Sequence, residues 1–300
     1  MANLTVLVPL DGSRLAELAL SFVGALGPLG DMKVRLLTVV ESGVHVAANE
    51  ERRRDELASQ YLEEVRQRLE AQQKVTVECV RRVGMAYKEI IEEADRFEVN
   101  LLLMSTHGRT SFDPERLGSV ADKVVRGSSC PTLLVGSHAS VPLTIERITV
   151  PLDGSALAAE ALPVARFFAE KLGARLRLVR AVQYPSSLDS DTIGSMAADV
   201  LGSIELTASM YLSEATLELE TSQPVETAVL SGPPSQALLT DLKENRSDLV
   251  IMTSHGHTGF IKWALGSVTD RLIRGPVPVL VLRPSSHVGD RLLPLAGRDG

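Results

Sequence analysis

The chain has 300 residues, a formal net charge of −7 and only 4% aromatic residues. This length predicts two domains, because one domain usually spans roughly 100 to 200 residues. Phosphate neutralisation needs clustered Lys and Arg, and base stacking needs aromatic rings, so we expect no nucleic-acid partner. No apolar run approaches the roughly 18 residues of a membrane helix, and two cysteines are too few for a disulfide framework. These features predict a cytoplasmic protein with no membrane contact.

Within the chain, short apolar runs alternate with segments of helical periodicity, a pattern typical of βαβ units and a parallel sheet. In chain order, the first half has strand-like runs LTVLVPL, KVRLLTVV, KVTVECV, NLLLMST and PTLLVGS. Helical stripes lie at 15–26, 57–69 and 87–97, and a fourth helix follows Gly118. Continuous apolar strands suit a sheet that is covered on both faces. The second half repeats this order with TVPLDGS, LRLVRAV, LELETS to PVETAVL, DLVIMTS and PVLVLRP.

The same domain therefore occurs twice in tandem. The segment LTVLVPLDGS returns as RITVPLDGSA, and LLLMSTHGRT returns as LVIMTSHGHT. We predict α/β architecture with two doubly wound, Rossmann-like domains, each an open five-stranded parallel sheet with four helices. The expected boundaries are domain 1 at 1–139, a linker at 140–146, domain 2 at 147–285 and a loose C-terminal tail at 286–300.

In each half the fourth strand leads through a glycine loop into a helix that begins with Gly-Ser. The two loops are Ser105-Thr-His-Gly108, nine residues, Gly118-Ser119-Val120, and Thr253-Ser-His-Gly256, nine residues, Gly266-Ser267-Val268. Glycine lets the backbone approach an anion, and the first amides of a helix carry partial positive charge. Ligands of open parallel sheets bind beyond the carboxyl ends of the strands, where Asp11 and Asp153 also lie. The pattern predicts two phosphate sites, although helix capping alone would explain a single Gly-Ser or Asp-Gly-Ser.

Together these motifs resemble those of a tandem universal stress protein. The resemblance covers nearly all of both halves, through Val-Pro-Leu-Asp-Gly-Ser, Met-x-x-His-Gly, the nine-residue spacer before Gly-Ser-Val, and Cys-Pro or Val-Pro before the last strand. It implies a stress-response protein that binds an adenine nucleotide (ATP, ADP or AMP), with Mg²⁺ accompanying the phosphates. The nucleotide-binding positions that it implies are Pro9, Asp11, Val39, Gly108, Gly118, Ser119 and Val120, and then Pro151, Asp153, Ala181, Gly256, Gly266, Ser267 and Val268.

Departures from the family pattern distinguish the two sites. A family glycine is replaced by Ser105 and Thr253, which makes close backbone approach harder. The first spacer contains Asp113 and Glu115, whose charges oppose a triphosphate, whereas the second has no acid and offers Lys262. We therefore rank the second site as the better nucleotide binder.

A catalytic or metal centre is not expected. Ser13 and Ser155 are interpreted as helix caps, and His255 with His257 has no third ligand nearby in the sequence. Neither common nucleotide signature, G-x-G-x-x-G or G-x-x-x-x-G-K-[ST], occurs. We expect a nucleotide-binding regulator rather than an enzyme. Two alternatives stay open: an interaction module with empty pockets, and a slow ATPase or autophosphorylating protein.

The last strand has a further implication. In the family that the chain resembles, this strand commonly pairs across a dimer. The resemblance therefore implies a homodimer or an intramolecular pseudo-dimer through the last strands, and the sequence leaves both arrangements open.

Overall fold

The computed structural model describes residues 3–40, 48–109, 116–139, 144–183, 194–254, 265–283 and 291–292. The first half contains β1 (Asn3–Pro9), α1 (Arg14–Glu17), η1 (Leu18–Leu20), α2 (Ser21–Ala25), η2 (Gly27–Leu29), β2 (Asp31–Val40), α3 (Ala48–Gln72), β3 (Thr76–Val83), α4 (Ala86–Arg96), β4 (Leu101–Ser105), α5 (Ser119–Gly127) and β5 (Thr132–Val135). The second half contains β6 (Arg147–Pro151), α6 (Ala156–Ala159), α7 (Ala161–Leu172), β7 (Arg175–Val182), α8 (Gly194–Glu218), β8 (Val225–Ser231), α9 (Pro234–Glu244), β9 (Leu249–Thr253), α10 (Ser267–Ile273) and β10 (Val279–Leu282).

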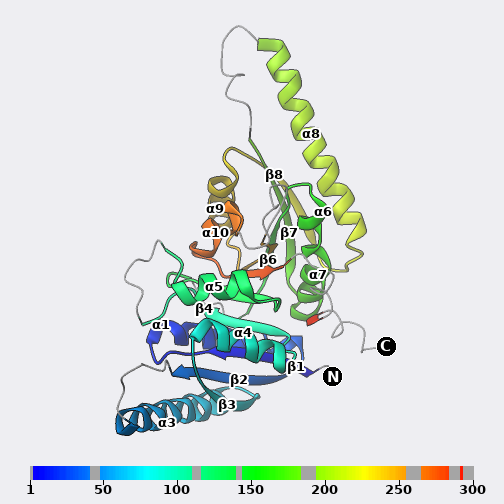
Figure 1. Cartoon of the computed structure of the whole chain (residues 1–300). Helices are drawn as coiled ribbons and strands as arrows, with labels where there is room; N and C mark the ends of the chain where they lie inside the picture. The colour runs from blue at the N-terminus through cyan, green and yellow to red at the C-terminus, as the bar shows by residue number, and fades with distance from the viewer. Residues whose placement is uncertain are drawn as a thin grey trace.

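All ten strands form one sheet in the order β3-β2-β1-β4-β5-β10-β9-β6-β7-β8 (Figure 1). Within each half the pairs are parallel and follow the same order, with the first strand in the middle. Helices cover both faces, as the doubly wound class requires. The predicted α/β class is confirmed, and the two five-stranded sheets turn out to be continuous.

The halves join through an antiparallel pair of last strands, β5 and β10. Leu133 lies opposite Leu280, and Leu134 lies opposite Val279. All four side chains are buried, so neither strand is an exposed edge. An unpaired edge strand would offer free N–H and C=O groups to other chains. Of the two arrangements left open by the sequence, the intramolecular pairing is the one that this structure contains.

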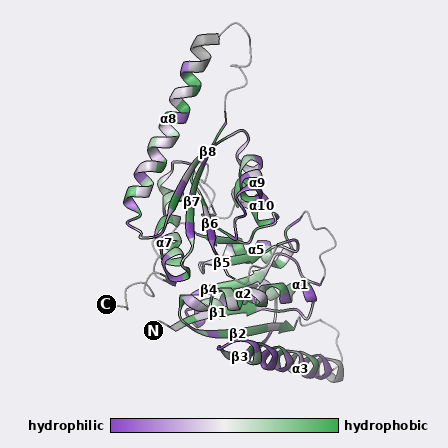
Figure 2. Ribbon diagram, turned by 180° about the vertical axis from the view of Figure 1, so that it is seen from behind, coloured by the Kyte–Doolittle hydropathy of each residue, from purple (hydrophilic) through white to green (hydrophobic). Residues whose placement is uncertain are grey.

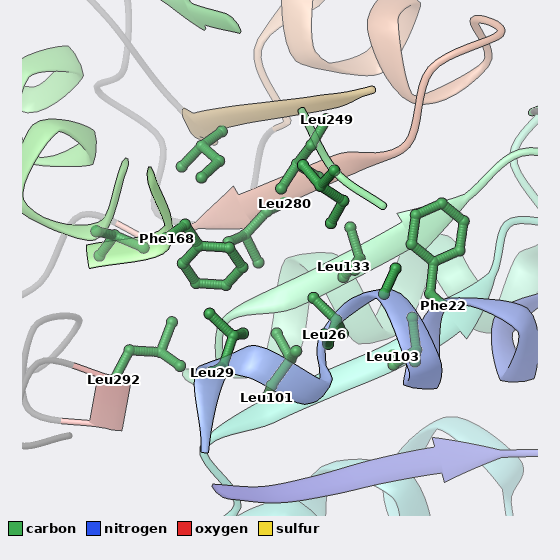
Figure 3. Close-up of a cluster of buried hydrophobic side chains, with 14 of the residues drawn as sticks. Phe22, Leu26, Leu29, Leu101, Leu103, Leu133, Phe168, Leu249, Leu280 and Leu292 are labelled. Carbon is green, nitrogen blue, oxygen red and sulfur yellow. The ribbon is translucent and has the colours of Figure 1, made fainter. Parts of the chain in front are cut away.

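Apolar side chains from both halves pack together on each face of the sheet. Figure 3 shows Phe22, Leu26 and Leu133 of the first half beside Phe168 and Leu280 of the second. A second cluster on the opposite face also draws on both halves. Because strand residues alternate between faces, the β5–β10 pair contributes to both clusters. The tandem copies therefore share their core.

The helix expected over residues 15–26 is divided. After α1 the N–H of Leu18 donates to the carbonyl of Leu15, three residues back, which is the tighter 3₁₀ pattern. The chain then passes through η1 into α2. A second difference lies at α8, which continues to Glu218 and so includes the start of the LELETS segment expected to be strand.

Two residues of the C-terminal segment are held against the first half. The guanidinium of Arg291 donates to the Val99 carbonyl at 3.2 Å and to Asp95 Oδ1 at 2.9 Å. Asn100 Nδ2 donates to the Arg291 carbonyl at 2.6 Å, and Leu292 is fully buried (Figure 3). The tail expected to be loose from residue 286 onward is thus anchored at these two residues, through a cation that satisfies main-chain carbonyls and a leucine in the core.

Equivalent long helices differ in their outer surfaces. α3 packs on β2 and β3, and α8 packs on β7 and β8, near the two ends of the sheet (Figure 1). Figure 2 shows a largely hydrophilic α3, whereas α8 is paler with hydrophobic patches. Leu206, Met210 and Leu217 of α8 are exposed. Among the residues that the structure describes, no helix combines the length and apolar character needed to span a membrane.

A buried ion pair fixes one helix onto the sheet in each half. In the first half, Arg35 of β2 bonds to Glu93 of α4 at 2.5 Å, and Arg82 bonds to the other carboxylate oxygen at 2.7 Å. Arg177 of β7 and Asp241 of α9 make the equivalent pair at 2.7 Å. These pairs hold α4 and α9 against the sheet.

Removal of the Glu93 carboxylate should be strongly destabilising, because the buried Arg35 then keeps the partly exposed Glu78 at 2.6 Å but loses its buried carboxylate partner. We expect Glu93→Ala to lower the free energy of unfolding by about 3 to 5 kcal/mol. Asp241→Ala should cost less, since the Arg177 side chain is 18% exposed whereas that of Arg35 is 4% exposed. Urea titration followed by circular dichroism measures both changes. Glu63→Ala removes an exposed pair and serves as the control; a loss as large as that of Glu93→Ala would contradict the argument.

Candidate functional sites

A pocket of about 370 Å³ opens in the first half beyond the carboxyl ends of β1, β2 and β4. Three segments that are far apart in the sequence meet there: the turn after β1, the end of β2, and the loop from β4 into α5. Seven predicted site residues line it: Pro9, Asp11, Val39, Gly108, Gly118, Ser119 and Val120. The structure therefore brings together every residue predicted for the first site.

The Asp-Gly-Ser turn forms one wall. Asp11 Oδ1 accepts the N–H of Ser13 at 2.9 Å, and Ser13 Oγ accepts an N–H of the first turn of α1 at 3.1 Å. The same contacts occur at Asp153 and Ser155. Gly12, between Asp11 and Ser13, has φ +83°, a left-handed conformation that favours glycine. The two serines are helix caps, as the sequence predicts.

Asp11 also clamps the loop that follows β4. Its Oδ2 accepts the N–H of Arg109 at 2.6 Å. A Cβ on Gly108 would lie 2.3 Å from the same oxygen, so a larger residue here would displace the Asp11 carboxylate from this contact. Ser105, which stands where the family has a glycine, accepts the N–H of His107 at 3.2 Å. This hydrogen bond stabilises the start of the loop.

The glycines at the helix starts also lie close to backbone carbonyls, and the contact is tighter at Gly118 than at Gly266. Gly118 has φ −59°, which any residue adopts, but its N–H donates to the Thr106 carbonyl at 2.9 Å. A Cβ on Gly118 would lie 2.8 Å from that oxygen. Gly266 makes the same bond to Ser254, with its hypothetical Cβ at 3.1 Å. The returning loop is thereby pinned to the end of the strand, and the first amides of the following helix lie at the pocket.

The second half has an equivalent pocket of about 260 Å³. Six predicted residues line it: Pro151, Asp153, Ala181, Gly266, Ser267 and Val268. The seventh, Gly256, lies outside the described residues, as do His255, His257 and Lys262 in this loop and Asp113 and Glu115 in the first. The charge difference between the spacers therefore stays a prediction. Within the described ranges, no three His, Cys, Asp or Glu residues form a group that could hold a metal ion.

Sequence reasoning missed one wall of each pocket. Ala86 and Ile90 of α4 line the first pocket, and Pro234 and Leu238 of α9 line the second. Helical periodicity marks such residues only as buried. Their signal is the repeat itself, because the same helix positions recur in both halves, after the turn glycines. The helices that carry them are those fixed by the buried ion pairs.

Charge also differs between the pockets. Arg116 lines the first pocket, near the start of α5, and was not singled out from the sequence. Among the described lining residues of the second pocket, Asp153 is the one charged side chain. The first pocket therefore pairs one carboxylate with one guanidinium, and both face a cavity with apolar walls formed by Val39, Ile90 and Met104.

The close contact of Gly118 yields a stability prediction. In Gly118→Ala the new methyl group would press on a backbone carbonyl that cannot swing away, so we expect a loss of about 1 to 3 kcal/mol. Gly202→Ala is the matched control, because it lies in α8 with no atom within 4 Å of the added Cβ. That change should stabilise the helix by about 0.5 to 1 kcal/mol. Thermal unfolding compares the two variants; equal stabilities would contradict the close contact.

The chain is similar in sequence to known proteins. Universal stress protein Rv2005c of Mycobacterium tuberculosis is 27% identical over 194 residues, which cover 63% of this chain and 63% of the relative. The match thus spans less than two thirds of that relative. Universal stress protein MJ0577 of Methanocaldococcus jannaschii is 29% identical over 152 residues, covering 43% of this chain and 93% of the relative.

Solved structures agree on the fold. The crystal structure of a universal stress protein from Archaeoglobus fulgidus has a TM-score of 0.68 at 24% identity, covering 94% of this chain and 98% of that one. The model of the universal stress protein family matches twice, at residues 3–136 and 144–283. The two matches leave few residues of either half unaccounted for, and the chain therefore belongs to the universal stress protein family, with two such domains in tandem.

Proposed function

We propose that this protein binds an adenine nucleotide, with ATP as the principal ligand, and acts in a stress response through binding rather than rapid turnover. One observation carries the proposal. The positions that the family resemblance assigns to the nucleotide come from three separate segments of each half, and those within the described residues line one pocket per half. Residues that were only caps for their own helices would have no reason to converge in this way.

The walls of the first pocket suit the parts of such a ligand. Apolar side chains of Val39, Ile90 and Met104 offer a surface for a flat base. The pocket volume of about 370 Å³ is in the range of small-molecule sites. The opposite side presents the Gly118 turn, the first amides of α5 and Arg116, which suit phosphate oxygens. Mg²⁺ would accompany the phosphates in this proposal.

The second site is proposed as the stronger one. This ranking depends on the spacers, since Lys262 would attract the phosphates that Asp113 and Glu115 repel. Arg116 acts in the other direction, because it adds a positive charge to the first pocket. Together with Arg109, it balances the two acids of the first spacer, whereas the second spacer has Lys262 and no acid, so the comparison still favours the second half.

The cellular setting belongs to the same proposal. Cys79 and Cys130 are free thiols, and burial raises the pKa of Cys130 to about 12. These two free thiols, both in the first half, support a reducing compartment, which we take to be the cytoplasm. We propose no nucleic-acid partner, in keeping with the net charge of −7. Association of two chains would add to the internal pairing of β5 with β10, which already covers the last strands.

Nucleotide retained by the purified protein tests the main proposal. The protein is denatured, and released ATP, ADP and AMP are identified by mass spectrometry; ATP binding to nucleotide-free protein is then measured by calorimetry. We expect bound adenine nucleotide with little phosphate release over the time of the measurement. Absence of both retained nucleotide and ATP binding would favour an interaction module, and rapid phosphate release would favour an ATPase.

Matched variants test the ranking of the sites. Ser267→Ala removes one hydroxyl donor at the second pocket and should weaken ATP binding about 2- to 10-fold. Gly266→Val should abolish most binding, because its side chain would obstruct the turn. Ser119→Ala and Gly118→Val are the equivalent changes in the first half and should have smaller effects on total binding. Calorimetry gives the affinities and site numbers, and thermal unfolding checks each fold; larger effects in the first half would show that the ranking is wrong.

A further inference from the structure

Two equivalent tyrosines have different surroundings. Tyr61 of α3 and Tyr211 of α8 each precede a buried leucine, Leu62 and Leu212, at the start of the stripe that packs on the sheet. Both rings pack against the same hydrophobic cluster. In the first half, Tyr61 donates its hydroxyl to Glu17 at 3.1 Å. The two tyrosines therefore occupy equivalent positions, and the polar contacts of their hydroxyls can be compared directly.

Glu17 organises this corner of the first half. One carboxylate oxygen accepts the Tyr61 hydroxyl, and the other accepts a guanidinium nitrogen of Arg68 at 2.5 Å. Glu17 ends α1, and Ala159 ends the equivalent α6, which has the same serine cap. The second half thus has a methyl group where the first has an oxyanion that binds a tyrosine and an arginine.

Without an equivalent of the Glu17 carboxylate, the hydroxyl of Tyr211 lacks the acceptor that Tyr61 has. Its oxygen is buried and has no hydrogen-bond partner in the part of the chain that the structure describes. Burial raises the pKa of this phenol, and the charges of Asp153 and Glu218 raise it further, while Arg180 lowers it. The hydroxyl therefore remains protonated at neutral pH and is available as a donor.

An arginine lies beside it. Arg180 replaces the equivalent Thr38, whose hydroxyl is satisfied by the Leu10 carbonyl at 3.1 Å. The guanidinium carbon of Arg180 is 5.1 Å from the centre of the Tyr211 ring. It also lies against the turn after β6, since a Cβ on Gly154 would be 2.8 Å from Arg180 Nη2. Among the described contacts of Arg180 there is no ion pair with a carboxylate.

We propose that Arg180 and Tyr211 form a binding site for a small oxyanion, a phosphate or carboxylate group, which takes the part played by the Glu17 carboxylate in the first half. A guanidinium presents several donors in one plane, and this geometry matches two oxygens of such a group. The tyrosine hydroxyl supplies a further donor. The carboxylates whose charges act on Tyr211 are Asp153 and Glu218. One oxygen of Asp153 accepts the N–H of Ser155 at 2.9 Å and its hydroxyl at 2.6 Å.

This site is separate from the proposed nucleotide pocket. Val179 and Ala181 of β7 line that pocket, so Arg180 between them points to the opposite face of the sheet. On that face lie α6, α7 and α8, whereas α9 and α10 cover the other (Figure 1). The Asp153–Ser155 turn lies between the Arg180–Tyr211 site and the nucleotide pocket. Occupation of one does not require occupation of the other.

Thermal unfolding of the full chain in inorganic phosphate, with chloride at matched ionic strength as reference, tests the site. We expect phosphate to raise the unfolding temperature by about 2 to 4 °C, with acetate as the probe for carboxylate. Arg180→Met should remove this shift. Ala159→Glu should remove it as well and should raise the unfolding temperature without phosphate, because the new carboxylate would bond to Arg180 and Tyr211 as Glu17 bonds in the first half.

Phosphate binding in the nucleotide pocket would also raise the unfolding temperature. A second pair of measurements distinguishes binding there from binding at Arg180 and Tyr211. Gly266→Val should retain the phosphate shift, and Arg180→Met should retain ATP binding by calorimetry. A shift that survives in Arg180→Met but disappears in Gly266→Val would overturn the proposal, because the anion would then bind in the pocket. So would an Ala159→Glu variant that is no more stable than the parent and still responds to phosphate. Failure of ATP binding alone would leave this site unaffected.

Discussion

Pairing of β5 with β10 is the interaction on which the rest of the molecule depends. Three antiparallel residue pairs, with Leu133 opposite Leu280 at the centre, turn two half-sheets into one and cover the edge that each half would otherwise expose. The same leucines bring the cores of both halves into contact (Figure 3). Each domain is therefore completed by the other, and the tandem sequence makes this contact permanent by joining the partners in one chain.

Within that frame, polar groups set the position of the pockets. The buried pairs of Arg35 with Glu93 and of Arg177 with Asp241 hold α4 and α9, whose apolar residues form one wall. Asp11 and Gly118 fix the loop that forms the opposite side. The ion pairs, the helix-start glycines and the carboxylates of Asp11 and Asp153 recur in both halves, whereas Arg116 has no charged counterpart among the described lining residues of the second pocket.

The sequence predicts most of the fold and much of the sites because these depend on local patterns that occur twice. Apolar runs identify the strands, and the glycines mark turns where a Cβ would collide with Asp11 or with a carbonyl. The partner of β5 could not be predicted, since a buried last strand has the same pattern whether its neighbour is its own chain or another. Ile90 looks like any core residue, and Arg291 lies in a segment without periodicity, so their contacts appear only in three dimensions.

The antiparallel junction also determines direction. Every strand of the first half runs parallel to β5, and every strand of the second runs parallel to β10. The carboxyl ends of the two sets consequently lie at opposite margins of the sheet, and the pockets open away from each other. A single small ligand cannot bridge them. The two pockets are therefore joined through the shared core and the β5–β10 pair, and they face opposite margins of one sheet.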